Sequence, residues 1–164
     1  MKKIIVLLFV FSATLMNAQG YKGKGDAKMQ IGANIQNGGT GIFVSTDFGV
    51  GENMSLGISG NYLLSTDNIV GEKVKFLDRA DLKARFNANL GNVFKLSPKM
   101  DIYPGLDLGL RNFGGHLGFR YFFTNGFGVF SEAGIPIAKY KSNPVGYEKL
   151  NNQFVFNIGM SFNL

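Results

Sequence analysis

His116 is the only histidine in this sequence of 164 residues, and it is the side chain best suited to proton transfer near neutral pH. Nucleophilic catalysis would require a hydroxyl within hydrogen-bonding distance of its ring. Ser65 and Ser142 are candidate partners, but no spacing motif ties either of them to His116. We therefore favour a histidine paired with a neighbouring polar side chain, and keep catalysis by His116 as the alternative.

Acidic and basic side chains alternate closely between positions 78 and 132. Carboxylates in such segments can bind a cation, but interleaved arginines favour salt bridges instead. The sequence has no cysteine, which excludes disulfides and thiolate metal sites. It also contains no phosphate-binding loop, metal-binding helix motif or serine elbow. We therefore expect no cofactor, no metal site and no enzymatic activity.

The composition favours short strands over helices as the scaffold for these residues. The chain has 23 glycines, 16 phenylalanines and six tyrosines, with only four prolines. Apolar residues make up 45% and charged residues 17%, which excludes a disordered chain. The formal net charge is +6, but the basic residues are dispersed, so nucleic-acid binding is not expected.

The first eighteen residues have the organisation of a secretory signal peptide. Lys2 and Lys3 precede an apolar run over 4–11, and Ala18 before Gln19 is the expected cleavage site. This run is too short to span a bilayer as a helix. The sequence thus predicts a signal peptide at 1–18, a periplasmic segment at 19–27 and one folded domain at 28–164.

Apolar and polar residues alternate with a period of two along most of that domain. The clearest case is 154–164, where every even position is apolar. Glycine- and asparagine-rich turns separate the segments, and successive hairpins of this kind form an up-and-down antiparallel sheet. An all-β barrel of eight strands is therefore predicted. The expected strands are 28–36, 41–49, 54–64, 78–90, 100–111, 116–123, 127–135 and 154–164.

The two faces of these strands favour a transmembrane barrel over a soluble, lipocalin-type barrel. The polar face carries acids and bases in near balance, including Lys28 and Asp47, together with many glycines, as suits a narrow closed lumen. The apolar face is large and ends in aromatic residues, as a lipid-facing band does. The residues expected to form an ion-pair network in the lumen are Arg79, Asp81, Lys83, Arg85, Asp101, Asp107, Arg111, Arg120 and Glu132.

Three segments resemble the small outer-membrane barrels related to OmpX and to the transmembrane domain of OmpA. They are MSLGISGNYLL at 54–64, GFRYFFTNGFGVFSEAGIP at 118–136 and FVFNIGMSFNL at 154–164. The resemblance implies a place in the outer membrane of a Gram-negative cell. It also implies that the assembly machinery reads residues 154–164, although that signal normally ends in phenylalanine and this chain ends in Leu164.

The long connections 65–77 and 136–152 are expected on the outer side of the membrane, and the tight turns 49–53 and 124–126 in the periplasm. We expect a structural, adhesive or surface-binding role for these outer loops, with no wide pore. Their lysines could contact lipopolysaccharide phosphates or a surface partner. The alternatives are a lipid-modifying enzyme that uses His116 and, more weakly, a carrier of small apolar molecules. The candidate contact residues are Lys73, Lys75, Lys139, Tyr140, Lys141 and Tyr147.

The turns also predict how the strands align. A turn at 112–115 would place Asp107 opposite Arg120, and Arg111 opposite His116. The 91–99 connection would place Lys83 opposite Asp107, and the 124–126 turn would place Glu132 one diagonal step from Arg120. The sequence therefore predicts a belt of alternating charge across the lumen.

Overall fold

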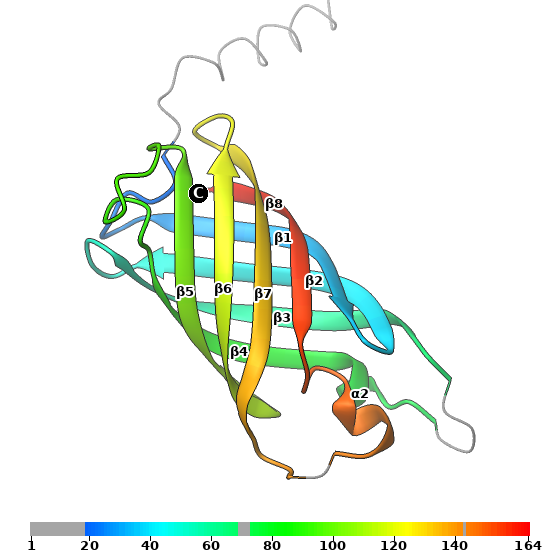
Figure 1. Ribbon diagram of the computed structural model, residues 1–164. Coiled ribbons are helices and arrows are strands. Elements are labelled where there is room, and N and C mark those ends of the chain that lie inside the picture. Colours follow the sequence, from blue (N-terminus) through cyan, green and yellow to red (C-terminus); the bar gives the residue numbers. More distant parts are fainter. Residues whose placement is uncertain (1–18, 69–72, 143) are drawn as a thin grey trace, which may run out of the picture.

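The computed structural model is a closed antiparallel barrel of eight strands, in which each strand pairs with its neighbours in sequence and β8 pairs with β1 (Figure 1). The structure describes residues 19–68, 73–142 and 144–164, so the predicted signal peptide lies outside the described residues. The predicted fold class is confirmed. The strands are β1 (Ala27–Gln36), β2 (Gly39–Gly49), β3 (Met54–Thr66), β4 (Ala80–Ala88), β5 (Met100–Gly109), β6 (Asn112–Phe122), β7 (Phe127–Lys139) and β8 (Val155–Asn163).

Polar side chains fill the inside of the barrel and large apolar side chains cover its outside. Along β1, Lys28, Gln30 and Asn34 point inward and are at most 1% exposed. Outward residues such as Leu56 and Leu82 are at least half exposed. The predicted assignment of the two faces is confirmed, because the polar residues of the alternating segments are the buried ones and the large apolar residues are the exposed ones. Four aromatic residues also lie inside, each at most 2% exposed: Phe43, Tyr103, Phe122 and Phe130.

The expected turn at 112–115 is wrong. Those residues belong to β6, and the β5–β6 hairpin turns at Leu110 and Arg111 instead. Gly114 faces inward within the strand, where an added Cβ would lie 2.8 Å from the carbonyl oxygen of Ile135. The absence of a side chain at Gly114 thus permits β6 and β7 to pack closely at this point. The fourth strand was expected at 78–90 and begins at Ala80, because the chain first forms the short helix α2 (Phe76–Arg79).

The two ends of the barrel differ in their covering. The end that carries Gln19 and the C-terminus, here called the terminal end, has the connections 50–53, 89–99 and 123–126. Residues 19–26 bridge two of these: the amide of Gly20 donates to the carbonyl of Pro98, and the Tyr21 hydroxyl donates to the carbonyl of Met54 at 2.6 Å. Burial of the Tyr21 phenol, with the nearby Asp26, raises the pKa of Tyr21 to about 12.

The opposite end, here called the loop end, carries α2 and the 3-10 helix η1 (Gly146–Lys149), which lie beneath the barrel in the view of Figure 1. A small apolar core of Leu63, Tyr147 and Leu150 holds η1 against β3, with Val74 packed beside it. Among the described residues, no helix is long and apolar enough to cross a membrane.

Candidate functional site

Arg85 lies at the centre of the charged network inside the barrel. Its Nη2 is 2.6 Å from Glu132 Oε2 on β7, and its Nε is 3.3 Å from Asp47 Oδ1 on β2. The Arg85 side chain is completely buried in the lumen. Charged side chains from three separated strands are thus tied together in a site closed to bulk water, where such pairs are strengthened.

Arg120 on β6 forms the second cationic centre. Its Nη2 is 2.8 Å from Asp101 Oδ2, and its Nη1 is 3.7 Å from Asp47 Oδ2. The guanidinium also lies over the ring of Tyr103, at 4.4 Å from the centroid. Asp47 therefore lies between both arginines, and the two cations are balanced by several carboxylates.

His116 belongs to this network. Its Nδ1 is 2.9 Å from Asp107 Oδ2, and its Nε2 is 2.8 Å from Asn87 Oδ1 and 2.9 Å from Arg85 Nη2. The residue is 6% exposed and lies within β6, inside the lumen. Within the parts of the chain that the structure describes, none of its hydrogen bonds goes to a hydroxyl. The predicted pairing of His116 with a polar neighbour agrees with this geometry.

The predicted charge belt is wrong in its central pairs. Asp101, and not Asp107, is the cross-strand partner of Arg120. Arg85, and not Lys83, is the partner of Asp107. Both errors come from the positions of the connections, and the larger one from placing the β5–β6 turn too late in the chain. The partner of His116 is accordingly Gly105, and not Arg111 as expected.

Glu132 is placed as the 124–126 turn predicted, with a different ion pair. It lies opposite Gly118, while Arg120 lies opposite Phe130, so Glu132 and Arg120 are one diagonal step apart. The Glu132 carboxylate nevertheless binds Arg85. Register can be inferred from a short turn, but the length and reach of an arginine decide which carboxylate it meets.

The remaining predicted network residues lie towards the loop end. Asp81 and Lys83 form a separate, longer pair at 3.8 Å on β4. Arg111 lies in the β5–β6 turn and pairs with Asp78 at 3.4 Å, outside the lumen network. Arg79 lies in α2 and makes no ion pair with any described residue. The expectation that Arg79 and Arg111 belong to the lumen is therefore wrong, since the chain leaves the barrel wall at both positions.

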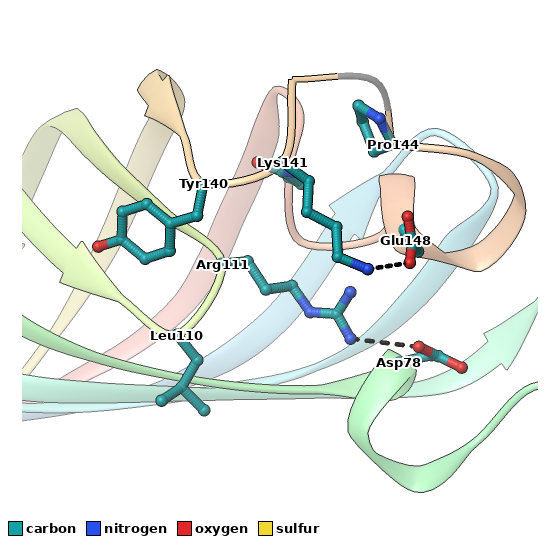
Figure 2. A pocket seen from close by; sticks show the side chains of 8 residues that line it. Asp78, Leu110, Arg111, Tyr140, Lys141, Pro144 and Glu148 are labelled. Atoms are coloured by element: carbon teal, nitrogen blue, oxygen red, sulfur yellow. Dashed lines mark hydrogen bonds and ion pairs between the residues drawn. The ribbon is translucent and has the colours of Figure 1, made fainter.

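A cavity of about 280 Å³ opens at the loop end between the β5–β6 turn, the segment after β7, and η1 (Figure 2). The side chains of Arg111 and Lys141 reach side by side across it to Asp78 and Glu148. The hydrogen bond from Lys141 holds the pKa of the Glu148 carboxyl below its usual range. The residues lining the cavity are Asp78, Leu110, Arg111, Tyr140, Lys141, Pro144, Glu148 and Asn152.

The predicted outer-loop contact residues divide into exposed and buried ones. Lys73 and Lys75 are exposed and line a second opening of about 360 Å³ beside Glu148. Lys139 and Tyr140 are exposed at the end of β7, and Tyr140 is 54% accessible. Tyr147 is only 7% exposed and packs in the small apolar core, so the expectation that it is a surface contact is wrong.

Three acidic residues of these clusters were absent from the predicted lumen network and from the predicted outer-loop contacts. Asp47 links the two lumen arginines, and its inward position within the alternating segment 41–49 was the available signal. Asp78 and Glu148 bind the loop-end cations. Their pairing depends on how α2 approaches the β5–β6 turn and how η1 approaches the segment after β7, which no local pattern in the sequence specifies. No group of three or more potential metal-ligating side chains occurs among the described residues.

Residues 9–164 match the model of a family of unknown function, DUF6646. The chain belongs to this family. No curated protein matches it. Among solved structures it is similar to one from work described as de novo design of transmembrane beta-barrels, with a TM-score of 0.56 and 12% sequence identity over 87% of this chain and 98% of that one. At this identity the likeness concerns the fold alone. This DUF6646 member thus shares its architecture with a barrel designed for membranes.

Proposed function

We propose that this DUF6646 protein is a small barrel of the bacterial outer membrane, exported by a signal peptide at 1–18, with a structural or surface-binding role. The observation that carries the proposal is the inverted distribution of its side chains. Arginines and carboxylates fill the lumen, whereas residues such as Ile58 and Leu108 are more than half exposed on the outer wall. Contact between such an apolar wall and water is unfavourable in free energy, whereas contact with lipid hydrocarbon is not.

A row of aromatic rings at the terminal end supports a membrane interface there. Tyr121 contacts Phe123 with ring centroids 5.2 Å apart, and Phe123 contacts Phe127 at 6.1 Å. Phe127 in turn contacts Phe162 at 5.8 Å. Transmembrane barrels carry such aromatic girdles where the hydrocarbon meets the headgroups.

The filled lumen supports a barrel that is not a pore. Phe43 and Phe130 meet inside it with centroids 5.6 Å apart, and the buried Arg85 guanidinium lies over the Phe43 ring at 6.0 Å from its centroid. A role like that of the OmpX-related barrels, with insertion guided by residues 154–164, is consistent with this arrangement. We propose no enzymatic role, because the described hydrogen bonds of His116 go to Asp107, Asn87 and Arg85.

The loop end is the proposed binding surface. Lys73, Lys75 and Lys139 are exposed there, beside the exposed Tyr140 and the cavity at Lys141. Cationic side chains close to a membrane attract phosphate groups of lipids, and lipopolysaccharide is the lipid phosphate expected on the outer side. A protein partner on the cell surface is the other class that these loops would suit.

Cell fractionation of the expressed full-length protein tests the proposal. We expect the mature chain in the outer-membrane fraction, with a gel mobility that changes on heating because the closed hydrogen-bonded barrel resists detergent until it is melted. Recovery of a folded protein in the soluble periplasmic fraction would contradict it.

A further inference from the structure

The terminal end of the barrel has an opening that the roles above do not use. It has a volume of about 410 Å³ and lies between residues 22–24, the β2–β3 turn and the β4–β5 connection. Its lining includes Lys22, Lys24, Asn53, Asn92 and Val93, together with Glu52 and Gly23. Ammonium and amide donors thus surround one cavity from three separate segments.

The cations of this end are not neutralised. Lys22 and Lys24 are exposed and make no ion pair within the described part of the chain. Lys95 and Lys99 follow in the β4–β5 connection, and Glu52 is the one exposed acid in residues 19–26, 50–53, 89–99 and 123–126. The other acid of these segments, Asp26, is buried and bound to Lys28 at 2.7 Å. This surface therefore presents an excess of positive charge.

Apolar side chains project beside these cations. Val93 is 53% exposed and Phe94 is 58% exposed, although both lie in a connection and not on the barrel wall. The turn that presents them is tight: the amide of Phe94 donates to Leu90 at 2.9 Å, and Lys95 has a left-handed φ of 52°. A non-glycine residue in that conformation costs free energy, so the surrounding contacts must hold this turn in its shape.

We propose that this terminal-end cavity binds the headgroup of an anionic phospholipid. Lys22 and Lys24 would hold the phosphate, the amides of Asn53 and Asn92 would bond its oxygens or glycerol hydroxyls, and Val93 and Phe94 would contact the start of the acyl chains. Cationic and apolar groups next to one another are what an amphiphile requires, and neither a free anion nor a purely apolar ligand would use both. The inference rests on the proposed membrane location.

The test uses the refolded full barrel in non-ionic detergent micelles, with native mass spectrometry counting retained lipid. We expect phosphatidylglycerol to be retained in preference to phosphatidylcholine. The double variant Lys22→Gln/Lys24→Gln should lower phosphatidylglycerol retention about tenfold or more. The matched control Lys95→Gln/Lys99→Gln removes the same charge from the same end of the barrel, outside the residues that line the cavity, and should change retention little. Phe94→Ser should weaken retention of the same lipid.

Three results would overturn the inference: equal loss in both double variants, equal retention of the two lipids, or displacement of the lipid by millimolar inorganic phosphate. Heat-dependent gel mobility is recorded first for every variant, so that a misfolded protein is not scored. If the Lys22→Gln/Lys24→Gln protein does not fold, phosphatidylglycerol retention by the unsubstituted barrel is measured at increasing salt concentration. We expect retention to fall, because ion pairs between exposed groups weaken with ionic strength. Retention that does not change with salt would overturn the inference. A barrel that folds in micelles and fails these tests contradicts only the lipid site, whereas a soluble protein contradicts the proposed function.

Discussion

The Arg120 guanidinium is bound to the Asp101 carboxylate of the neighbouring strand, with Nη2 2.8 Å from Oδ2 and both side chains inaccessible to solvent. The two residues are direct cross-strand partners in the β5–β6 hairpin. Asp101 also accepts a hydrogen bond from the amide of Gly91 at 3.0 Å. This carboxylate thus connects the lumen network with the connection that closes the terminal end.

Asp101→Ala is expected to destabilise the barrel by about 3–5 kcal/mol, because it leaves the buried Arg120 without its closest carboxylate. Urea unfolding in micelles, followed by gel mobility, measures the change. Asp67→Ala removes an exposed carboxylate at the loop end and should have an effect within about 0.5 kcal/mol. An Asp101→Ala protein as stable as the unsubstituted one would show that Asp47 alone can balance Arg120.

The strands and their faces could be predicted from the sequence, but the charge pairing could not. Alternation of apolar and polar residues decides which side chains enter the lumen, so Arg85, Arg120 and Glu132 were assigned to the correct face. Pairing depends on register, and Gly114 and Gly115 resemble turn residues although they are strand residues. Placing the turn at 112–115 instead of 110–111 moved the partner of Arg120 from Asp101 to Asp107.

Gly118→Ala is expected to destabilise the barrel by at least about 1–3 kcal/mol, because its Cβ would overlap the buried ring of Tyr103. That ring cannot move freely, since its hydroxyl accepts a hydrogen bond from Gln30 at 2.9 Å and Arg120 lies over its face. The same unfolding measurement applies.

Gly60→Ala is the matched control for this substitution. Gly60 lies in β3, and an added Cβ would come no closer than 3.8 Å to the carbonyl oxygen of Asp81. The added methyl group should therefore be tolerated at Gly60 and not at Gly118. Equal stability of the two variants would mean that Tyr103 does not occupy the position described.

Lys141→Gln is expected to raise the pKa of the Glu148 carboxyl towards its ordinary value of 4.5, because the hydrogen bond from Lys141 now holds it lower. A depressed pKa in the folded state stabilises the loop above the ordinary pKa, and the contribution disappears as pH falls through the lowered value. Carbon-detected NMR titration of Glu148 measures the shift. An unchanged titration in the variant would contradict the pairing across the loop-end cavity.

The loop-end cavity was only partly accessible to sequence reasoning. Exposed lysines in long connections can be identified from composition, as Lys73, Lys75 and Lys141 were. Tyr147 could not be distinguished from them, because its burial depends on Leu63 of a distant strand. Contacts between loops that are far apart in the sequence have no periodic signal.

The unsubstituted barrel is expected to show no stable, porin-sized conductance in planar bilayers. Eight strands leave an interior just wide enough for side chains. Phe43 and Phe130 meet across it, and each is only 2% exposed. The double variant Phe43→Ala/Phe130→Ala removes this contact and should admit small, brief ion leaks. Phe48→Ala/Phe127→Ala removes the same number of rings from the outer wall and should remain silent. A large, reproducible open state of the unsubstituted barrel would show that the lumen charges line a channel and do not seal it.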